Sequence, residues 1–330
     1  MVSDSDIIEY AYKNALRGNA LDRETVIALL EIRAESVAAG KLGEAARKVA
    51  AEITENSGRV WASIGVDYAP CPVSCHFCSF GEQWGVVREE YRWSTAEIVD
   101  LAKKFLYGGA KWITLRTTEY YSLAELTALA KQIRQTIPGN YGIVANTGEL
   151  TDQTARLLMS SGVSVIYHSL RLREGIDTGL SIKSRLETLA AVQASPLDLA
   201  FLVEPVGSEH TSAELADAFL TAMNYDASLT GVMARIPVPG TPLGHIPVVS
   251  ERRLAQIAAV TRLAAGCNAP DICIHPASLL ALEWGANVVV VEVGAIPRDT
   301  GNSKKEWNNF DLETAFTWFK QADYKVDRGV

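Results

Sequence analysis

The 330-residue sequence predicts a (β/α)8 TIM-type barrel, an α/β fold, with a helical segment in front of it. From residue 59 onward, short runs rich in β-branched and aromatic residues alternate with capped amphipathic segments. This alternation is typical of a parallel sheet covered by helices. The sequence contains eight such runs, the number that closes a barrel. A doubly wound open sheet shares the alternation and is the alternative.

The first 57 residues carry only helical patterns. Apolar residues recur at the spacing of one helix face between residues 7 and 16, and a second run follows Asp22, a predicted N-cap. A third run ends near Gly58. We therefore expect an N-terminal helical extension, residues 1–57, and a barrel domain, residues 58–330.

The eight predicted strands are short, apolar and separated by helical segments. They cover residues 60–66, 112–116, 141–146, 163–169, 197–203, 231–237, 271–275 and 286–293. Several helix starts have the spacing of a capping box, namely Ser94 with Glu97, Ser122 with Glu125, and Thr211 with Glu214. Glycines that commonly end helices precede three strands, at Gly109, Gly162 and Gly285. A last amphipathic helix is predicted after Asp311.

The net charge of −8 argues against a nucleic-acid or anionic-membrane binder, because such proteins usually carry a basic patch and the basic residues here are scattered. No stretch approaches the roughly 20 apolar residues of a membrane span. The acidic, amphipathic start is unlike a secretory signal. We expect a cytoplasmic protein with a small-molecule substrate and no nucleic-acid or membrane partner.

Three of the five cysteines lie within eight residues, in the segment CPVSCHFC that follows the first predicted strand. An odd, tightly clustered set indicates metal binding more than a disulfide framework. Loops after the strands form the active-site face of a barrel. Thiols spaced as Cys71, Cys75 and Cys78 can reach three corners of a [4Fe-4S] cube and leave one iron open to a substrate.

Two other interpretations of this segment are open. The cysteines could be buried structural residues. They could also bind zinc with His76 as fourth ligand. Because Cys75 and His76 are consecutive, their side chains cannot readily both point at one tetrahedral ion, and the cluster is the favoured interpretation.

The C-x3-C-x2-C spacing, with the aromatic Phe77 before the last cysteine, resembles the signature of the radical S-adenosylmethionine (SAM) superfamily. The resemblance implies that SAM chelates the open iron through its amino and carboxylate groups. It implies that an electron from a donor such as ferredoxin or flavodoxin cleaves the sulfonium. The 5′-deoxyadenosyl radical then abstracts hydrogen from an unactivated carbon.

Nearly the whole chain is similar to the biotin-synthase-like branch of that superfamily, including its C-terminal segment. The segments LRTTEYY, ANTGEL, EPVGSEHT, PVPGTPL and GANVVVVEVGAIPRDT most resemble 3-methylornithine synthase and the [Fe]-hydrogenase guanylylpyridinol cofactor assembly proteins. The first cysteine gap is shorter than in the guanylylpyridinol group.

The resemblance also implies a set of SAM contacts. A basic and an acidic residue after the fourth strand, Arg173 and Glu174, and Arg185 on the next helix would bind its charged groups, unless they form a solvated loop salt bridge. Thr118 and Glu119 after the second strand would contact its amino group. Asn146 closes the third strand and is either a ligand contact or part of a turn. Further strand ends carry polar residues that suit a polar substrate, namely His168, Glu204, Glu209, His210, Arg235 and His275.

These features predict a radical SAM enzyme that abstracts hydrogen from a small polar substrate in cofactor or unusual-amino-acid biosynthesis, by rearrangement, fragmentation or C–H functionalisation. Sulfur insertion, as in biotin or lipoyl synthesis, is one alternative. However, Cys267 and Cys273 are the only cysteines after Cys78, and we expect both to be structural. A non-catalytic metal-binding scaffold is the other alternative.

Overall fold

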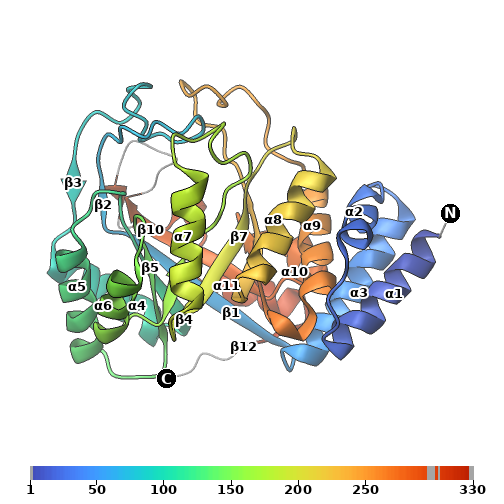
Figure 1. The fold of residues 1–330 in the computed structure, drawn as a ribbon. Coiled ribbons are helices and arrows are strands. Elements are labelled where there is room, and N and C mark those ends of the chain that lie inside the picture. The colour runs from blue at the N-terminus through green and yellow to red at the C-terminus, as the bar shows by residue number, and fades with distance from the viewer. Residues whose placement is uncertain (1–2, 296–301, 304, 327–330) are drawn as a thin grey trace.

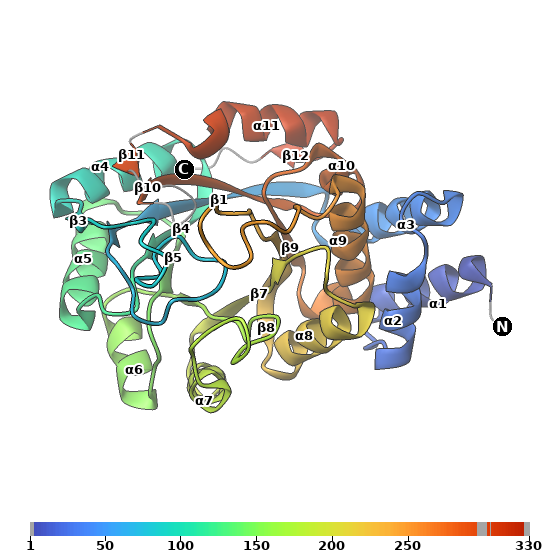
Figure 2. The same cartoon turned by 90° about the horizontal axis from the view of Figure 1, so that it is seen from above.

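The computed structural model describes residues 3–295, 302–303 and 305–326. Eight parallel strands form a closed barrel with helices around it (Figures 1 and 2). The first strand pairs with the second on one side and with the last on the other, where Arg59–Gly65 align with Val288–Gly294. The predicted barrel is therefore confirmed, and the open-sheet alternative is wrong because no edge separates the first strand from the last.

The eight barrel strands follow the predicted order. They are β1 (Ser57–Gly65), β4 (Ala110–Arg116), β5 (Gly142–Asn146), β6 (Val165–Tyr167), β7 (Asp198–Val206), β8 (Ala227–Ala234), β9 (Asp271–His275) and β10 (Val288–Ala295). Four short strands lie outside the barrel wall, namely β2 (Asp67–Tyr68), β3 (Tyr91–Arg92), β11 (Asn302–Ser303) and β12 (Lys325–Val326).

Three strands begin earlier than predicted, namely β1, β4 and β8, and the difference is largest at β8. Gly231 suggests a strand start, but it lies inside β8 with a φ of +147°, and a Cβ there would lie 2.0 Å from the Cys273 carbonyl oxygen. The glycine is required by this close approach of two backbones. The segment 285–300 that supports the family resemblance lies partly outside the described residues, from residue 296 onward.

A helix follows each barrel strand, and Figure 2 shows α4 to α11 arranged around the strands. The extension contributes three further helices. The bounds are α1 (Asp4–Arg17), α2 (Arg23–Glu31), α3 (Val37–Ile53), α4 (Thr95–Tyr107), α5 (Leu123–Thr136), α6 (Asp152–Ser160), α7 (Ile182–Gln193), α8 (Ser212–Asn224), α9 (Glu251–Ala265), α10 (Leu279–Glu283) and α11 (Leu312–Gln321). No helix among the described residues is long and apolar enough to cross a membrane.

The predicted helix ends are largely confirmed. Asp22 and Asp311 cap α2 and α11, and full capping boxes begin α4 and α8. Ser122 caps α5 without the reciprocal bond, because the Glu125 carboxylate instead pairs with Arg92 at 3.2 Å. The glycines predicted to end helices have positive φ, at Gly109, Gly162 and Gly285.

The extension packs on α8 and α9, and Figure 2 shows α1 to α3 on that side of the barrel. Polar side chains of α9 satisfy carbonyl groups at and beyond the end of α2, which have no partner within that helix. The Gln256 amide donates to the Ile32 oxygen at 2.5 Å, and Arg252 Nε donates to the Ala34 oxygen at 2.7 Å. These bonds attach the extension to the barrel.

The barrel interior has an apolar layer below a polar mouth. Residues from most of the strands form this layer, namely Trp61, Val144, Val165, Ala200, Leu202, Leu229, Cys273 and Val288. At the amino-terminal end of the barrel, Arg59 pairs with Asp271. The interior is therefore closed below, and a ligand can enter only from the carboxyl ends of the strands.

Candidate active site

The cysteine loop follows β1 and is folded back on itself by backbone hydrogen bonds. The Cys71 amide donates to the Phe80 oxygen at 2.6 Å, and the Glu82 amide donates to the Cys71 oxygen at 3.0 Å. Trp84 Nε1 donates to the Cys75 oxygen at 3.0 Å. A Cβ at Gly81 would lie 2.2 Å from the Trp84 ring, so the fold of the loop depends on glycine at that position.

The three loop cysteines are half-buried and unbridged, and they lie close enough to influence one another. The pKa of the Cys75 thiol is raised to about 12, chiefly by burial, with Arg171 acting in the opposite direction and the neighbouring cysteines adding to the increase. Among the described residues, no three His, Cys, Asp or Glu side chains surround a single point as ligands of one ion would. A [4Fe-4S] cube takes one thiolate at each of three corners, and the sequence spacing of the three cysteines fits that motif.

His76 is directed away from these thiols. Its Nδ1 lies 3.5 Å from Asp177 Oδ1, and its ring meets Trp84 edge-on at 5.9 Å between centroids. The structure therefore does not assemble the Cys3His set that a zinc site would need.

A cavity of about 220 Å³ opens beside the cysteine loop at the mouth of the barrel. Phe77 and Cys78 form one side of it. The upper ends of the barrel strands form the rest, with apolar side chains from the layer below and polar ones at the rim. The polar lining residues are Ser63, Thr114, Arg116, Asn146, Tyr167, Arg171, Glu204, Arg235, His275 and Glu292.

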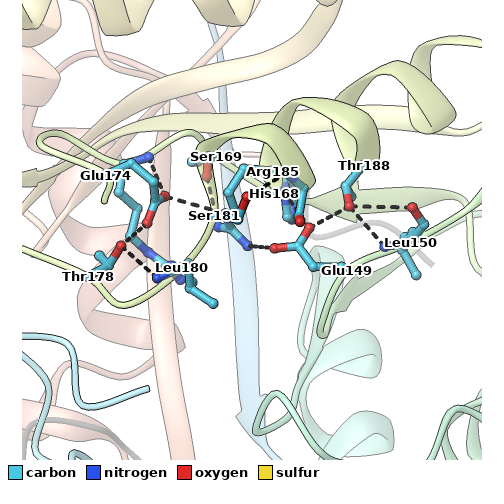
Figure 3. Close-up of polar contacts among 12 residues, drawn as sticks. Glu149, Leu150, His168, Ser169, Glu174, Thr178, Leu180, Ser181, Arg185 and Thr188 are labelled. Atoms are coloured by element: carbon cyan, nitrogen blue, oxygen red, sulfur yellow. Dashed lines mark hydrogen bonds and ion pairs between the residues drawn. The ribbon is translucent and has the colours of Figure 1, made fainter. Parts of the chain in front are cut away.

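An ion-pair network joins the loop that follows β6 to α7 and to Glu149, which precedes α6 (Figure 3). Arg185 Nε is 3.4 Å from Glu174 Oε2, and Arg185 Nη1 donates to Glu149 Oε1 at 3.2 Å. Arg185 Nη2 donates to the Ser169 oxygen at 2.8 Å. His168 is also enclosed, with Nε2 3.6 Å from Glu149 Oε2. Both terminal nitrogens of Arg185 are therefore hydrogen-bonded, whereas Nε makes only the ion-pair contact with Glu174.

Glu174 is held equally firmly. Its carboxylate accepts the Arg171 amide at 3.0 Å and the Thr178 hydroxyl, in addition to the Arg185 contact. The Glu174 side chain therefore stabilises the conformation of the loop between β6 and α7.

The remaining predicted SAM contacts lie in different surroundings. The Thr118 amide and hydroxyl both donate to Asp67, at 2.9 and 2.5 Å, so Asp67 fixes that turn. Burial raises the pKa of Glu119, while Arg171 and Arg185 act to lower it, so Glu119 lies within electrostatic range of both arginines. Asn146 lines the cavity and donates to the Tyr167 oxygen at 3.2 Å.

Arg173 is turned away from the cavity. It has a φ of +55°, and its guanidinium donates to Glu214 Oε1 at 2.9 Å and to the Glu209 oxygen at 3.2 Å. This contact at the start of α8 is the salt bridge that the sequence allowed as its alternative role.

Other strand-end residues form pairs around the mouth. Tyr167 donates its hydroxyl to Glu204, whose other oxygen lies 3.8 Å from Arg171 Nε. Both terminal nitrogens of Arg235 donate to Glu209. His275 Nε2 lies 3.5 Å from Glu292 Oε2. Of the six strand-end residues expected to form a polar pocket, Glu204, Arg235 and His275 line the cavity, and each has a partner within the protein.

The two later cysteines occupy different places. Cys267 is exposed at the amino-terminal side of β9, against Gly18 at the end of α1. Cys273 is buried in the apolar layer below the cavity. Neither lies beside the cysteine loop.

Comparison with known proteins gives relatives along most of the chain, although no family model matches. Biotin synthase of Parafrankia sp. is 28% identical over 272 residues, which is 79% of this chain and 73% of that protein. Biotin synthase of Natronomonas pharaonis is 24% identical over 302 residues, 86% and 76% of the two chains. Both alignments span most of this chain, whose loop after β1 carries C-x3-C-x2-C. These similarities support a biotin-synthase-like radical SAM assignment for the chain.

Solved structures share this fold at low identity. Methylornithine synthase (PylB) has a TM-score of 0.78 at 17% identity and covers 96% of this chain and 97% of its own. HydG, a maturase of the [FeFe]-hydrogenase, has a TM-score of 0.80 at 14% identity and covers 100% and 77%. The cofactors that belong to this radical SAM assignment are a [4Fe-4S] cluster and SAM, and the loop cysteines fit the cluster motif.

Sequence reasoning missed Glu149 and assigned no role to Arg171 or Tyr167. Glu149 follows the expected contact Asn146 by three residues and precedes a helix, which is a signal for a strand-end site. Its partner Arg185 lies 36 residues away, so the pairing emerges only when α7 packs beside that loop.

Proposed function

We propose that this protein is an enzyme that reductively cleaves SAM at a [4Fe-4S] cluster and abstracts hydrogen from a small polar substrate in cofactor or unusual-amino-acid biosynthesis. The cavity at the barrel mouth carries this proposal. It is bounded by Phe77 and Cys78 on one side and by polar strand ends on the other, so a small molecule inside it lies next to the cysteine loop.

In this proposal Cys71, Cys75 and Cys78 hold the cluster. When bound, the cluster supplies the electron that breaks a sulfonium bond of SAM, and the released 5′-deoxyadenosyl group takes a hydrogen atom from the substrate. The chain itself positions the substrate and excludes water from the cavity. The apolar layer, with Trp61 and Leu202 at its top, closes the cavity from below and excludes water from the reacting carbon.

The polar wall beside the loop is proposed to bind SAM. Glu119 and Asn146 would face it, and Thr118 would fix the turn that presents Glu119. Glu174 and Arg185 would hold the wall in shape. Because Arg173 is committed to Glu214, we propose that it braces the rim.

The proposal includes an external electron donor, such as ferredoxin or flavodoxin, and a cytoplasmic location. The absence of disulfides among the five cysteines is compatible with a reducing compartment.

Sulfur insertion is less well supported, because the barrel strands carry too few cysteines for a second cluster. A second, sacrificial cluster needs several ligands, and Cys273 is the only cysteine on a barrel strand. Its thiol is enclosed by apolar neighbours below the cavity.

The direct test is SAM cleavage by anaerobically purified protein with dithionite as reductant. We expect methionine and 5′-deoxyadenosine in comparable amounts, which a scaffold would not produce. In Glu174→Ala and Arg185→Ala, SAM affinity should fall about 10- to 100-fold with the cluster retained, because each change removes charge-assisted contacts, worth about 1.5–3 kcal/mol, that hold the SAM-binding wall in place. Unchanged affinity in both variants would remove these residues from the SAM site.

A further inference from the structure

We propose that a second cavity, between the starts of α8 and α9, binds a small oxyanion with His210 and Arg253 as its donors. The chemistry that fits is a phosphoryl group or a carboxylate on a short apolar body. This outer cavity has a volume of about 280 Å³. Its lining comes from the end of β7, the loop that follows it, one residue of α8, and the first two turns of α9 with the residues before them.

The outer cavity is distinct from the cavity beside the cysteine loop. Among the residues that the structure describes, none lines both. Arg235 lines the barrel cavity and pairs with Glu209, on the loop after β7. Gly207 lines the outer cavity, and a Cβ there would lie 2.4 Å from Arg235 Nη2. The two cavities are therefore neighbours, but a molecule in the outer one does not occupy the proposed SAM site.

His210 offers the outer cavity a hydrogen-bond donor that has no acceptor. Its side chain is 1% exposed, and its Nδ1 accepts the Gly207 amide at 2.8 Å. Burial lowers the pKa of His210, and a neutral ring whose Nδ1 accepts carries its proton on Nε2. Nε2 has no hydrogen-bond partner among the described residues. The Glu209 carboxylate is 3.9 Å away and already accepts from Arg235. A buried donor of this kind calls for an acceptor.

Arg253 brings a positive charge that no adjacent carboxylate neutralises. Its guanidinium donates to three neutral groups, the Leu30 oxygen, Gln256 Oε1 at 2.9 Å and Ser212 Oγ at 3.3 Å. No Asp or Glu oxygen of the described residues lies within 4.0 Å of it. Burial lowers the pKa of Arg253, as expected for a cation that is short of a counter-charge. A bound anion would supply that charge.

The start of α9 adds to the attraction for an anion. Ser250 caps this helix, whose first turn carries a partial positive charge. Ser250 Oγ accepts the Arg253 amide at 3.2 Å, which leaves the hydroxyl hydrogen for a ligand. Leu215, Val249 and Ile257 form an apolar part of the wall. An oxyanion with a short hydrocarbon body therefore matches both halves of the lining.

The test is isothermal titration calorimetry of the anaerobic, cluster-loaded protein with butyl phosphate, butyrate and butyramide. Butyramide has the shape of butyrate without its charge. His210→Asn keeps an oxygen that can accept the Gly207 amide and loses the Nε2 donor. Ser208→Asp places a negative charge at the exposed rim of the outer cavity. Arg253→Gln removes the cation.

Two exposed positions provide matched changes of charge. Ser3→Asp adds an acid at the cap of α1, and Arg156→Gln removes a base on α6. We expect wild type and both controls to bind butyl phosphate or butyrate with a Kd of about 1 mM or tighter, and butyramide about tenfold more weakly. His210→Asn, Ser208→Asp and Arg253→Gln should each weaken acid binding about tenfold. The tighter acid identifies the head group as phosphoryl or carboxylate.

The proposal is overturned if wild type binds neither acid saturably, or binds butyramide as well as butyrate. Unchanged acid affinity in His210→Asn and Ser208→Asp would also overturn it, whatever Arg253→Gln does, because Arg253 additionally bonds to the extension at Leu30. SAM affinity in Ser208→Asp should equal that of wild type. A parallel loss of SAM affinity would place the anion in the barrel cavity and contradict a separate site.

Discussion

Arg185 and Glu174 form an ion pair from which solvent is almost excluded, with 3.4 Å between Nε and Oε2 and side chains that are 3% and 2% exposed. The two residues lie at the ends of one connection, the loop after β6 and the helix α7. Because neither charge can be solvated alone, the pair fixes that loop and, with it, Arg171.

Removing Arg185 should destabilise the fold severely. Arg185→Met leaves Glu174 as an uncompensated buried charge, which typically costs about 3–5 kcal/mol. Arg23→Met breaks the exposed pair with Asp217 and should cost less than about 1 kcal/mol. Urea titrations of both variants give the free energies of unfolding. Equal small losses would show that water reaches the Arg185 network.

The close approach of Gly148 to Glu119 should matter for SAM binding. A Cβ at residue 148 would lie 2.8 Å from the Glu119 carbonyl oxygen and 3.2 Å from its Oε2, so Gly148→Ala must displace that segment. Overpacking of this kind costs about 1–3 kcal/mol, and we expect SAM affinity to fall about tenfold with iron content unchanged.

Gly40→Ala is the matched control for that substitution. Gly40 lies in α3, where an added Cβ meets nothing within 4 Å. The change should raise the free energy of unfolding by about 0.5–1 kcal/mol and leave SAM affinity unaltered. If both glycine variants bind SAM like wild type, Glu119 is not part of the SAM site.

Burial of His168 predicts a pH dependence. Burial, followed by the nearby Arg185 and Arg171, holds the pKa of His168 well below its usual 6.5. Below pH 6.5, His168 is therefore protonated in the unfolded chain and remains neutral in the folded chain. The free energy of unfolding should fall as pH drops below 6.5, by up to about 1.4 kcal/mol for each pH unit, and this contribution should be flat above it.

His168→Gln should remove its share of this slope between pH 6.5 and 5. His210 contributes in the same direction, because burial also lowers its pKa. Identical slopes in wild type and His168→Gln, from urea titrations at each pH, would mean that His168 accepts a proton in the folded state.

Local signals in the sequence were sufficient to predict the barrel. Capping residues such as Ser94 and Thr211 act through contacts three residues away, so they can be recognised without the fold. The cysteine loop was recognised because its three cysteines are also close in sequence. The start of β8 was predicted wrongly because Gly231 was interpreted as a strand start. Glycine is needed at this position because the Cys273 backbone, on another strand, comes too close for a side chain.

The roles of Arg171 and Arg173 could not be separated from the sequence. Both follow β6, two residues apart, and either could face the cavity. The positive φ at Arg173 changes the direction of the chain after Arg171, and the Arg173 guanidinium donates a hydrogen bond to Glu214 from α8. That outcome depends on the packing of two neighbouring βα units, which no local pattern records.

The later cysteines should be dispensable. Cys267 is exposed and Cys273 is enclosed in the apolar layer, so the double variant Cys267→Ala/Cys273→Ala should retain the wild-type iron content and SAM cleavage. If wild type instead holds about eight irons and the variant about four, a second cluster exists. Sulfur insertion would then become the leading function.

The central claim is tested most directly by iron and acid-labile sulfide analysis of anaerobically purified protein. Wild type should hold about four of each per chain, and the triple variant Cys71→Ala/Cys75→Ala/Cys78→Ala should hold neither and cleave no SAM. The Cys267→Ala/Cys273→Ala variant controls for the loss of thiols elsewhere. A full cluster in the triple variant, or zinc in place of iron in the wild type, would contradict the assignment.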